Sequence, residues 1–420
     1  MSRRRLLGAG LAATVAAPLL GCATGSGGPS IGRVVVIGGG FGGATAARYL
    51  RLWGNVDVTL VERHDSFVSC PISNLVLAGH RSIADITVPY SGLAASGVKR
   101  IQGEAVAIDA QARQVRLADG RSLPYDRLIL SPGIDFMLEQ VSGLTAATQE
   151  TILHSWKAGP QTVALRRQLE AMPDGGVYAL TVPKSPYRCP PGPYERAAMV
   201  ASYFKQHKPR SKVLVLDANP EIQSKKGLFE RAYAEHYKGI IEYRANNELK
   251  AVDVATRTAK LEFDDVKADV LNVVPPQRGG DLARAIGLLN MNARWAGVNW
   301  LTMESTAVPG IHVLGDTVMS APGMPKSGHM ANQHGKVAAA AIIQLLKGEA
   351  VNPTPVMTNT CYSYVTATDA MHVTSVHQYD PADKTLKPVP GGGVSAASTA
   401  AEGRFAWSWA RNIWADTLAT

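Results

Sequence analysis

Three cysteines could carry the chemistry of this chain, because a thiol can act as a nucleophile, a metal ligand or half of a disulfide. They are Cys70 in SFVSCPISN, Cys189 in YRCPPGPYE and Cys361 in TNTCYS, while a fourth, Cys22, lies near the N-terminus. One disulfide among the three would leave one thiol over, so the odd count itself requires an explanation.

The surroundings of Cys189 predict a strand–loop–helix–strand unit of dinucleotide-binding type. GGVYALTV predicts a strand, YERAAMVASYFKQH an amphipathic helix, and KVLVLD a second strand ending at Asp217. The loop YRCPPGPYE has three prolines and no glycine cluster, so it lacks backbone N–H donors that a pyrophosphate needs. We therefore expect NAD(P)H to be neither substrate nor product. The following helix N-terminus is expected to favour a Cys189 thiolate.

A clear dinucleotide signature lies near the start of the chain. RVVVIGGGFGGATAARYL predicts a buried strand, a glycine turn and a helix, with Gly38, Gly40 and Gly43 forming G-x-G-x-x-G. The next strand, VDVTLVER, ends at Glu62, whose carboxylate would bind an adenosine ribose. The alternative is a tight turn with a purely structural role.

Two later segments favour FAD over NAD at this first site. TAVPGIHVLGD, which ends at Asp316, is similar to the second FAD motif of two-dinucleotide-binding flavoproteins, whose aspartate holds the ribitol chain. YDRLILSPG is similar to the strand and turn that link their domains. A helix is predicted from about Ala331 to Lys347, and the similarity to these flavoproteins implies that its positive N-terminal end faces the flavin. Lys326 adds to that charge, unless it is a solvated surface lysine.

The C-terminal region changes in style after about residue 350. TNTCYSYV and MHVTSVHQYD predict strands, PGGGVSAAS predicts a loop, and the tail containing Trp407, Trp409 and Trp414 predicts an amphipathic helix. We expect that helix to pack on the protein's own core; docking to a partner or a membrane surface is the alternative. No metal site is expected, and His312, His329 and His334 are expected to be structural or surface residues.

These segments together resemble the flavoprotein subunit of flavocytochrome c sulfide dehydrogenase along nearly the whole mature chain. The specific matches are YRCPPGPYERA, VVPPQRGG, MPKSGH, GKVAAAA, NTCYS and the terminal SW..NI..DT. The resemblance implies an α/β fold with two Rossmann-like dinucleotide-binding domains, the FAD domain being discontinuous, and a C-terminal α+β domain. The expected divisions are a signal and linker (1–30), the first FAD-binding segment (31–150), a second Rossmann-like domain without a fingerprint (151–278), the second FAD-binding segment (279–350) and a C-terminal interface domain (351–420).

The resemblance also implies a role for each thiol. Cys70 aligns with the cysteine that bonds to the 8α-methyl group of the flavin; the alternative is a free buried thiol. Cys189 and Cys361 align with a redox-active disulfide near the flavin; the alternative is a structural disulfide. Hydrosulfide would attack that disulfide to give a persulfide and a thiolate, and two electrons would pass to FAD. Which cysteine is attacked stays open.

The electron acceptor implied by the family is haem c on a separate cytochrome subunit, because this chain has no C-x-x-C-H motif. Two other functions stay open. A sulfide:quinone oxidoreductase would pass electrons to membrane quinone. A flavin electron carrier or scaffold subunit, which is not an enzyme, would not be reduced by sulfide.

The N-terminal segment is typical of an export signal. Its Arg3–Arg5 cluster in SRRRLL is similar to a twin-arginine signal, and LLGC is similar to a lipobox. We expect a periplasmic protein, either lipid-anchored at Cys22 or cleaved nearby. The 43 Lys and Arg exceed the 34 Asp and Glu only mildly. No basic run is interleaved with aromatic residues, so nucleic acid is not an expected partner.

Overall fold

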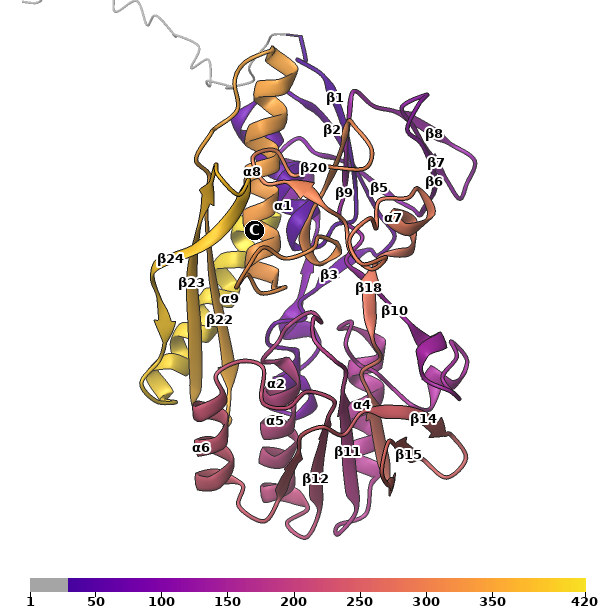
Figure 1. Ribbon diagram of the computed structural model, residues 1–420, viewed down its shortest axis with the longest axis vertical. Coiled ribbons are helices and arrows are strands. Elements are labelled where there is room, and N and C mark those ends of the chain that lie inside the picture. Colours follow the sequence, from indigo (N-terminus) through magenta and orange to yellow (C-terminus); the bar gives the residue numbers. More distant parts are fainter. Residues whose placement is uncertain (1–28) are drawn as a thin grey trace, which may run out of the picture.

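The computed structural model describes residues 29–420, so the expectations for Arg3–Arg5 and Cys22 lie outside the described residues. Figure 1 shows two sheets toward opposite ends of the long axis, with β22, β23 and β24 running beside them. The α/β class and the two Rossmann-like units are as expected. None of the described helices is long and apolar enough to cross a membrane.

The first unit is built on a seven-stranded sheet of order β19-β20-β21-β9-β1-β2-β5. Its strands are β1 (Arg33–Ile37), β2 (Asp57–Glu62), β5 (Lys99–Gln102), β9 (Arg127–Leu130), β19 (Val298–Asn299), β20 (Glu304–Ser305) and β21 (Ile311–Val313). β1 is parallel to β2 and β9, and β21 is parallel to β9, so their carboxyl ends meet at one edge. Two distant stretches of the chain therefore share one sheet.

Glycine allows the first unit to pack closely at its turn. β1 is a run of β-branched residues with Val34–Ile37 buried, as a parallel strand covered on both faces requires. Gly38 has a φ of +96°, and α1 (Phe41–Trp53) follows at once. A Cβ on Gly43 would lie 1.9 Å from the carbonyl oxygen of Gly38, so only glycine lets the helix sit this close to the turn.

The helix α8 (Gly328–Lys347) packs against α1 and ends where Gly348 takes a φ of +72°, as expected. It begins before the expected position because Ser327 caps it, its Oγ accepting a hydrogen bond from the N–H of Met330 at 3.0 Å. A Cβ on Gly335 would lie 2.6 Å from the oxygen of Gly42, so the two helices approach through small residues.

The second unit is a parallel sheet of order β13-β12-β11-β17. The strand–loop–helix–strand prediction around Cys189 is confirmed in this unit. Its elements are α4 (Pro160–Ala171), β11 (Val177–Val182), α5 (Gly192–His207), β12 (Lys212–Asp217), α6 (Lys226–His236), β13 (Ile241–Arg244) and β17 (Val270–Val273).

The C-terminal unit is an antiparallel sheet of β22 (Val356–Tyr364), β23 (Ala370–Asp380) and β24 (Thr385–Val394), followed by α9 (Ala400–Leu418). The loop expected at PGGGVSAAS is wrong for residues 390–394, because β24 continues through them, and is confirmed for residues 395–398. The glycines serve an irregular pairing instead: the register shifts between Thr374 and Val376, and a Cβ on Gly392 would lie 2.6 Å from the oxygen of Thr374.

The tail helix α9 packs on the protein's own core, as expected. Trp414 is buried, and Arg48 of α1 donates hydrogen bonds to the carbonyl oxygens of Ala415 and Asp416 at 2.6 and 2.5 Å. The remaining elements are β3 (Ser66–Val68), α2 (Ser73–Leu77), β4 (Thr87–Pro89), α3 (Ser91–Ala95), β6 (Ala105–Asp109), β7 (Gln114–Leu117), β8 (Ser122–Pro124), β10 (Ile134–Phe136), β14 (Leu249–Asp253), β15 (Thr258–Leu261), β16 (Asp265–Lys267), β18 (Gln277–Gly279) and α7 (Asp281–Ala285).

Candidate functional site

A cavity of about 290 Å³ lies where the units meet, and it gathers eight of the nine predicted site residues. Gly43 does not line it but supports the glycine turn from behind. The residues that line it are Gly38, Gly40, Glu62, Cys70, Cys189, Asp316, Lys326 and Cys361. All the cysteines of the described chain therefore face one space, although they come from three different units.

The glycine turn fits a dinucleotide. A Cβ added to Gly40 would meet nothing within 4 Å, so this position is open to the cavity. The N-terminus of α1 has no side-chain cap, which leaves its first N–H groups free to bind a pyrophosphate. Glu62 accepts hydrogen bonds from the N–H groups of Gly39 at 2.6 Å and His64 at 2.8 Å, which fixes its carboxylate beside the turn.

Asp316 follows β21 and lines the same cavity. Its Oδ1 is buried without a hydrogen-bond partner, although a carboxylate oxygen in that position needs a donor. A ribitol hydroxyl would supply one. The open glycine turn and this unpaired oxygen together fit FAD, with the first unit holding the adenosine end.

Lys326 is buried, so the alternative of a solvated surface lysine is wrong. The residue is 5% exposed, and its Nζ donates hydrogen bonds to the carbonyl oxygens of Asp316 at 3.1 Å and of Val318. The Nζ also lies 3.8 Å from the ring centroid of Trp295. Burial lowers the pKa of Lys326 to about 7, with Asp316 opposing the shift.

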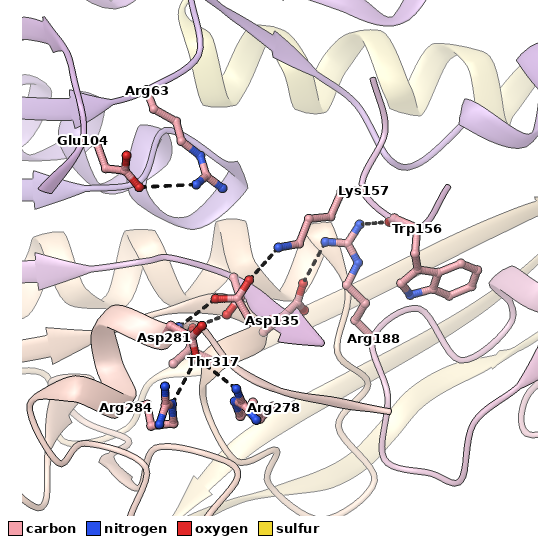
Figure 2. Close-up of polar contacts among 12 residues, drawn as sticks. Arg63, Glu104, Asp135, Trp156, Lys157, Arg188, Arg278, Asp281, Arg284 and Thr317 are labelled. Carbon is pink, nitrogen blue, oxygen red and sulfur yellow. Dashed lines mark hydrogen bonds and ion pairs between the residues drawn. The ribbon is translucent and has the colours of Figure 1, made fainter. Parts of the chain in front are cut away.

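Cys70 lies beside a buried arginine that the sequence patterns did not single out. Its Sγ accepts hydrogen bonds from Nη2 of Arg188 at 2.6 Å and from the N–H of Ala158 at 3.3 Å. The same Nη2 donates to the carbonyl oxygen of Trp156 at 2.7 Å, as Figure 2 shows, beside the ion pair of Lys157 with Asp135.

Cys189 and Cys361 are free thiols here, so their disulfide stays a prediction. The Cys189 loop is held beside Lys326, because the backbone N–H of Cys189 donates a hydrogen bond to the carbonyl oxygen of Lys326 at 2.8 Å. Burial raises the pKa of both thiols, and the nearby Cys361 raises that of Cys189 further. The expected Cys189 thiolate is therefore wrong: α5 begins only at Gly192, and desolvation outweighs its dipole.

Three family profiles match the chain. They describe the central domain of the sulfide dehydrogenase [flavocytochrome c] flavoprotein chain (residues 162–275), a flavocytochrome c sulphide dehydrogenase flavin-binding domain (353–418) and a pyridine nucleotide-disulphide oxidoreductase domain (32–169). The flavoprotein chain of that dehydrogenase from Chlorobaculum thiosulfatiphilum is 62% identical over 45 residues, which cover 10% of this chain and 94% of that sequence. The chain belongs to the flavocytochrome c sulfide dehydrogenase flavoprotein family.

Relatives of lower sequence identity match a larger part of this chain. The mitochondrial sulfide:quinone oxidoreductase of Mus musculus is 24% identical over 311 residues, covering 68% of this chain and 65% of the relative, just under two thirds of its length. The crystal structure of the sulfide:quinone oxidoreductase of Aquifex aeolicus superposes with a TM-score of 0.75 at 21% identity. That superposition covers 92% of this chain and 91% of the other, and it confirms the fold.

A buried acid and a buried lysine stand behind the two thiols of this flavoprotein, and neither was predicted from sequence. Lys225 donates hydrogen bonds to the carbonyl oxygen of Cys361 at 3.1 Å and to Oγ of Ser363 at 2.9 Å. Glu195 accepts from the N–H of Tyr364 at 2.8 Å, and burial raises the pKa of its carboxyl group. Glu195 is one of two charged residues at the start of the otherwise mostly apolar stretch ERAAMVASYF, whereas the polar stretch around Lys225 carries no such signal.

The second Rossmann-like unit closes the position where a nucleotide-binding domain holds its ribose. Asp217, at the end of β12, is fully buried, and its Oδ2 accepts hydrogen bonds from the hydroxyl groups of Tyr194 at 2.7 Å and Tyr243 at 3.0 Å. Its Oδ1 accepts from the N–H of Asn219 at 2.9 Å. Every oxygen of this acid is thus satisfied internally. The exclusion of NAD(P)H itself stays a prediction.

The histidines have structural partners. His334 Nδ1 accepts from the N–H of Gly315 at 3.1 Å, and His329 Nδ1 accepts from the N–H of Thr360 at 2.9 Å. His312 is buried, and its Nδ1 lies 2.8 Å from the carbonyl oxygen of Thr302. No cluster of potential metal ligands occurs among residues 29–420.

Proposed function

We propose that this chain is the flavoprotein of a sulfide dehydrogenase. It oxidises hydrosulfide through a disulfide between Cys189 and Cys361 and through FAD, and it passes the electrons to a c-type cytochrome subunit. The observation that carries the proposal is the single cavity in which both thiols meet the glycine turn and Asp316. The backbone hydrogen bond from Cys189 to Lys326 holds the loop that carries this thiol beside the lysine of the same cavity.

The chain's own residues account for the sulfur chemistry. Hydrosulfide attacks one sulfur of the disulfide, the S–S bond breaks, and a persulfide and a thiolate form. Burial disfavours a free thiolate at either cysteine. Transfer of the electron pair from that sulfur to an acceptor is therefore favoured. FAD supplies a two-electron acceptor when bound. Lys225 is the cation behind Cys361 that opposes the cost of negative charge there.

The cofactor and partner assignments extend the same proposal. FAD is bonded covalently at Cys70, and haem c resides on the partner only. We further propose, from the N-terminal sequence, that the protein is exported to the periplasm in folded form, with Cys22 as a candidate lipid anchor.

Rapid-scan absorbance of the purified protein mixed with sulfide tests the function. The absorbance band of the oxidised flavin should bleach after sulfide is mixed in, and it should recover when oxidised cytochrome c is added. Cys189→Ser and Cys361→Ser should keep FAD bound yet lose fast bleaching. Cys70→Ser is the matched control: it should still bleach, although its flavin is released on denaturation. Bleaching of either disulfide variant at the wild-type rate would make the disulfide a structural bond and remove the mechanism.

A quinone acceptor is the second candidate, favoured by the likeness to the murine sulfide:quinone oxidoreductase over 311 residues. The two functions separate in one experiment. Sulfide-reduced protein is mixed in turn with cytochrome c and with a soluble short-chain quinone. Faster reoxidation by the quinone would replace the cytochrome in the proposal.

A further inference from the structure

We propose that Arg188 is the positioning residue for covalent attachment of the flavin to Cys70. The proposal rests on the function given above, in which the flavin is bonded to Cys70. Nothing in the motifs assigns Arg188 a role, since the patterns single out the cysteine that follows it. The geometry around the Cys70 sulfur does.

The guanidinium of Arg188 is held firmly against the sulfur. Its Nη2 is 2.6 Å from Sγ of Cys70 and 2.7 Å from the oxygen of Trp156, and its backbone N–H donates to Oε1 of Gln277 at 3.0 Å. The side chain is 15% exposed. Nη1 of Arg188 lies 4.0 Å from Oδ2 of Asp316. Both side-chain contacts come from the same nitrogen of a planar guanidinium, so they hold the side chain in one orientation, whereas a surface arginine would move freely.

The charge balance around Arg188 also points to the sulfur. Burial lowers the pKa of Arg188, but Cys70 and Asp316 together raise it above its ordinary value. Asp316 is the residue expected to hold the ribitol chain. Arg188 therefore lies between Asp316, which would hold the ribitol chain, and Cys70, whose sulfur would form the covalent bond to the flavin. Trp156, which lines the same cavity, has a buried Nε1 without a partner, as a site awaiting a polar ligand would have.

Attachment of the flavin to Cys70 requires only the thiol, FAD and oxygen as reactants. The Cys70 sulfur forms a bond to the 8α carbon of FAD, one C–H bond of that methyl group and the S–H bond break, and the ring system gains two electrons and two protons. Dissolved oxygen then takes the two electrons and protons and becomes hydrogen peroxide. The sulfur attacks as an anion, and a fixed guanidinium stabilises the charge as the bond forms.

The expected size of the effect follows from the loss of one hydrogen bond that involves a charged group. Such a loss lowers a rate by about 10- to 100-fold, so about 30-fold is expected when the guanidinium of Arg188 is removed. The N–H of Ala158 stays in place when Arg188 is changed, so some attachment should survive.

The test is a time course of attachment. Apoprotein is mixed with FAD, samples are denatured in acid, and protein-bound flavin fluorescence is measured over a range of FAD concentrations. For Arg188→Ala we expect an unchanged half-saturating FAD concentration and a limiting rate about 30-fold lower. Methylguanidine added to this variant should restore much of the rate, and Arg188→Lys should be intermediate. Without oxygen, attached flavin should stay colourless until air is admitted.

Arg294→Ala is the matched control. Arg294 donates to the backbone oxygens of Gln277 at 2.7 Å and of Pro186 at 3.3 Å, so it anchors the same loop without touching Cys70. It should attach flavin at the wild-type rate.

Failure of Cys70 as the attachment site can be distinguished from failure of Arg188 as its positioning residue. A wild-type protein that binds FAD but never attaches it would overturn the role of Cys70 and, with it, that of Arg188. Attachment in the wild type at the same limiting rate as in Arg188→Ala would overturn only the role of Arg188. If Arg188→Ala fails to bind FAD, a wild-type rate in Arg188→Gln, whose amide can donate a hydrogen bond but carries no charge, would overturn it as well.

Discussion

The buried lysine at position 326 should make the protein without flavin more stable as the pH rises above neutrality. The pKa of Lys326 is about 7 in the fold, against 10.5 for an ordinary lysine, mainly because of burial. Between these values the unfolded chain binds a proton that the folded protein does not, so the free energy of unfolding increases with pH across this window.

The magnitude follows from the shift. At 1.36 kcal/mol per pKa unit, the lowered pKa of Lys326 destabilises the fold by about 5 kcal/mol at pH 6, where the buried lysine is charged. At pH 9 it destabilises the fold by about 2 kcal/mol, because the lysine must lose its proton on folding. Lys326→Met removes this pH-dependent cost. It also strands the carbonyl oxygens of Asp316 and Val318, a loss that is the same at both pH values. The advantage of the methionine variant should therefore shrink by about 3 kcal/mol between pH 6 and pH 9.

Urea denaturation followed by tryptophan fluorescence at pH 6 and pH 9 measures this difference. Both proteins should carry Cys70→Ala, from which flavin can be removed. Lys326→Arg is the control, because a guanidinium stays charged at both pH values and the stability gain of the wild type should disappear. Equal differences between Lys326→Met and wild type at pH 6 and pH 9 would refute the reasoning, since Lys326 would then titrate alike in the folded and unfolded chains.

The remaining predictions concern the glycine turn, the closed second nucleotide position and the N-terminus. Gly40→Ala should leave the apoprotein's stability unchanged within about 0.5 kcal/mol but weaken FAD binding at least tenfold in a fluorescence titration, because its methyl group enters open cavity. Gly43→Ala should instead destabilise the apoprotein itself by about 1–3 kcal/mol in urea, since its Cβ would lie 1.9 Å from a backbone oxygen. Tyr194→Phe removes one of two phenol donors to the buried Asp217 and should cost about 1–3 kcal/mol without admitting NADH, which spectrophotometry would reveal by flavin bleaching. Intact mass spectrometry of membrane-associated protein should show either a diacylglyceryl group on Cys22 or a chain that starts beyond it.

Sequence reasoning was strongest where neighbouring residues decide the structure. The turn of Gly38, Gly40 and Gly43 lies between a β-branched strand and a helix, so its conformation follows from local pattern alone. The α8 helix was also predicted, but its start was placed too late because the cap of Ser327 depends on a single side-chain hydrogen bond.

Prediction was weakest where distant segments decide an environment. The meeting of Cys189 and Cys361 in one cavity came from the family resemblance, since their spacing carries no signal. A lysine followed by serine and glycine gives no hint that Lys326 lies over a buried tryptophan. Arg188 went unnoticed because its partner, Cys70, comes from another unit of the fold. Local sequence likewise pointed to a thiolate at Cys189, but the opposing desolvation comes from the whole assembled site.

The composition of the cavity wall has a consequence for how the protein is made. The wall draws on residues from Gly38 to Trp409, which span almost all of the described chain. A nascent polypeptide on the ribosome therefore presents only fragments of the pocket until its last segments have emerged. Flavin capture becomes a late step of biosynthesis, and the yellow colour of the product reports that the chain was both finished and assembled.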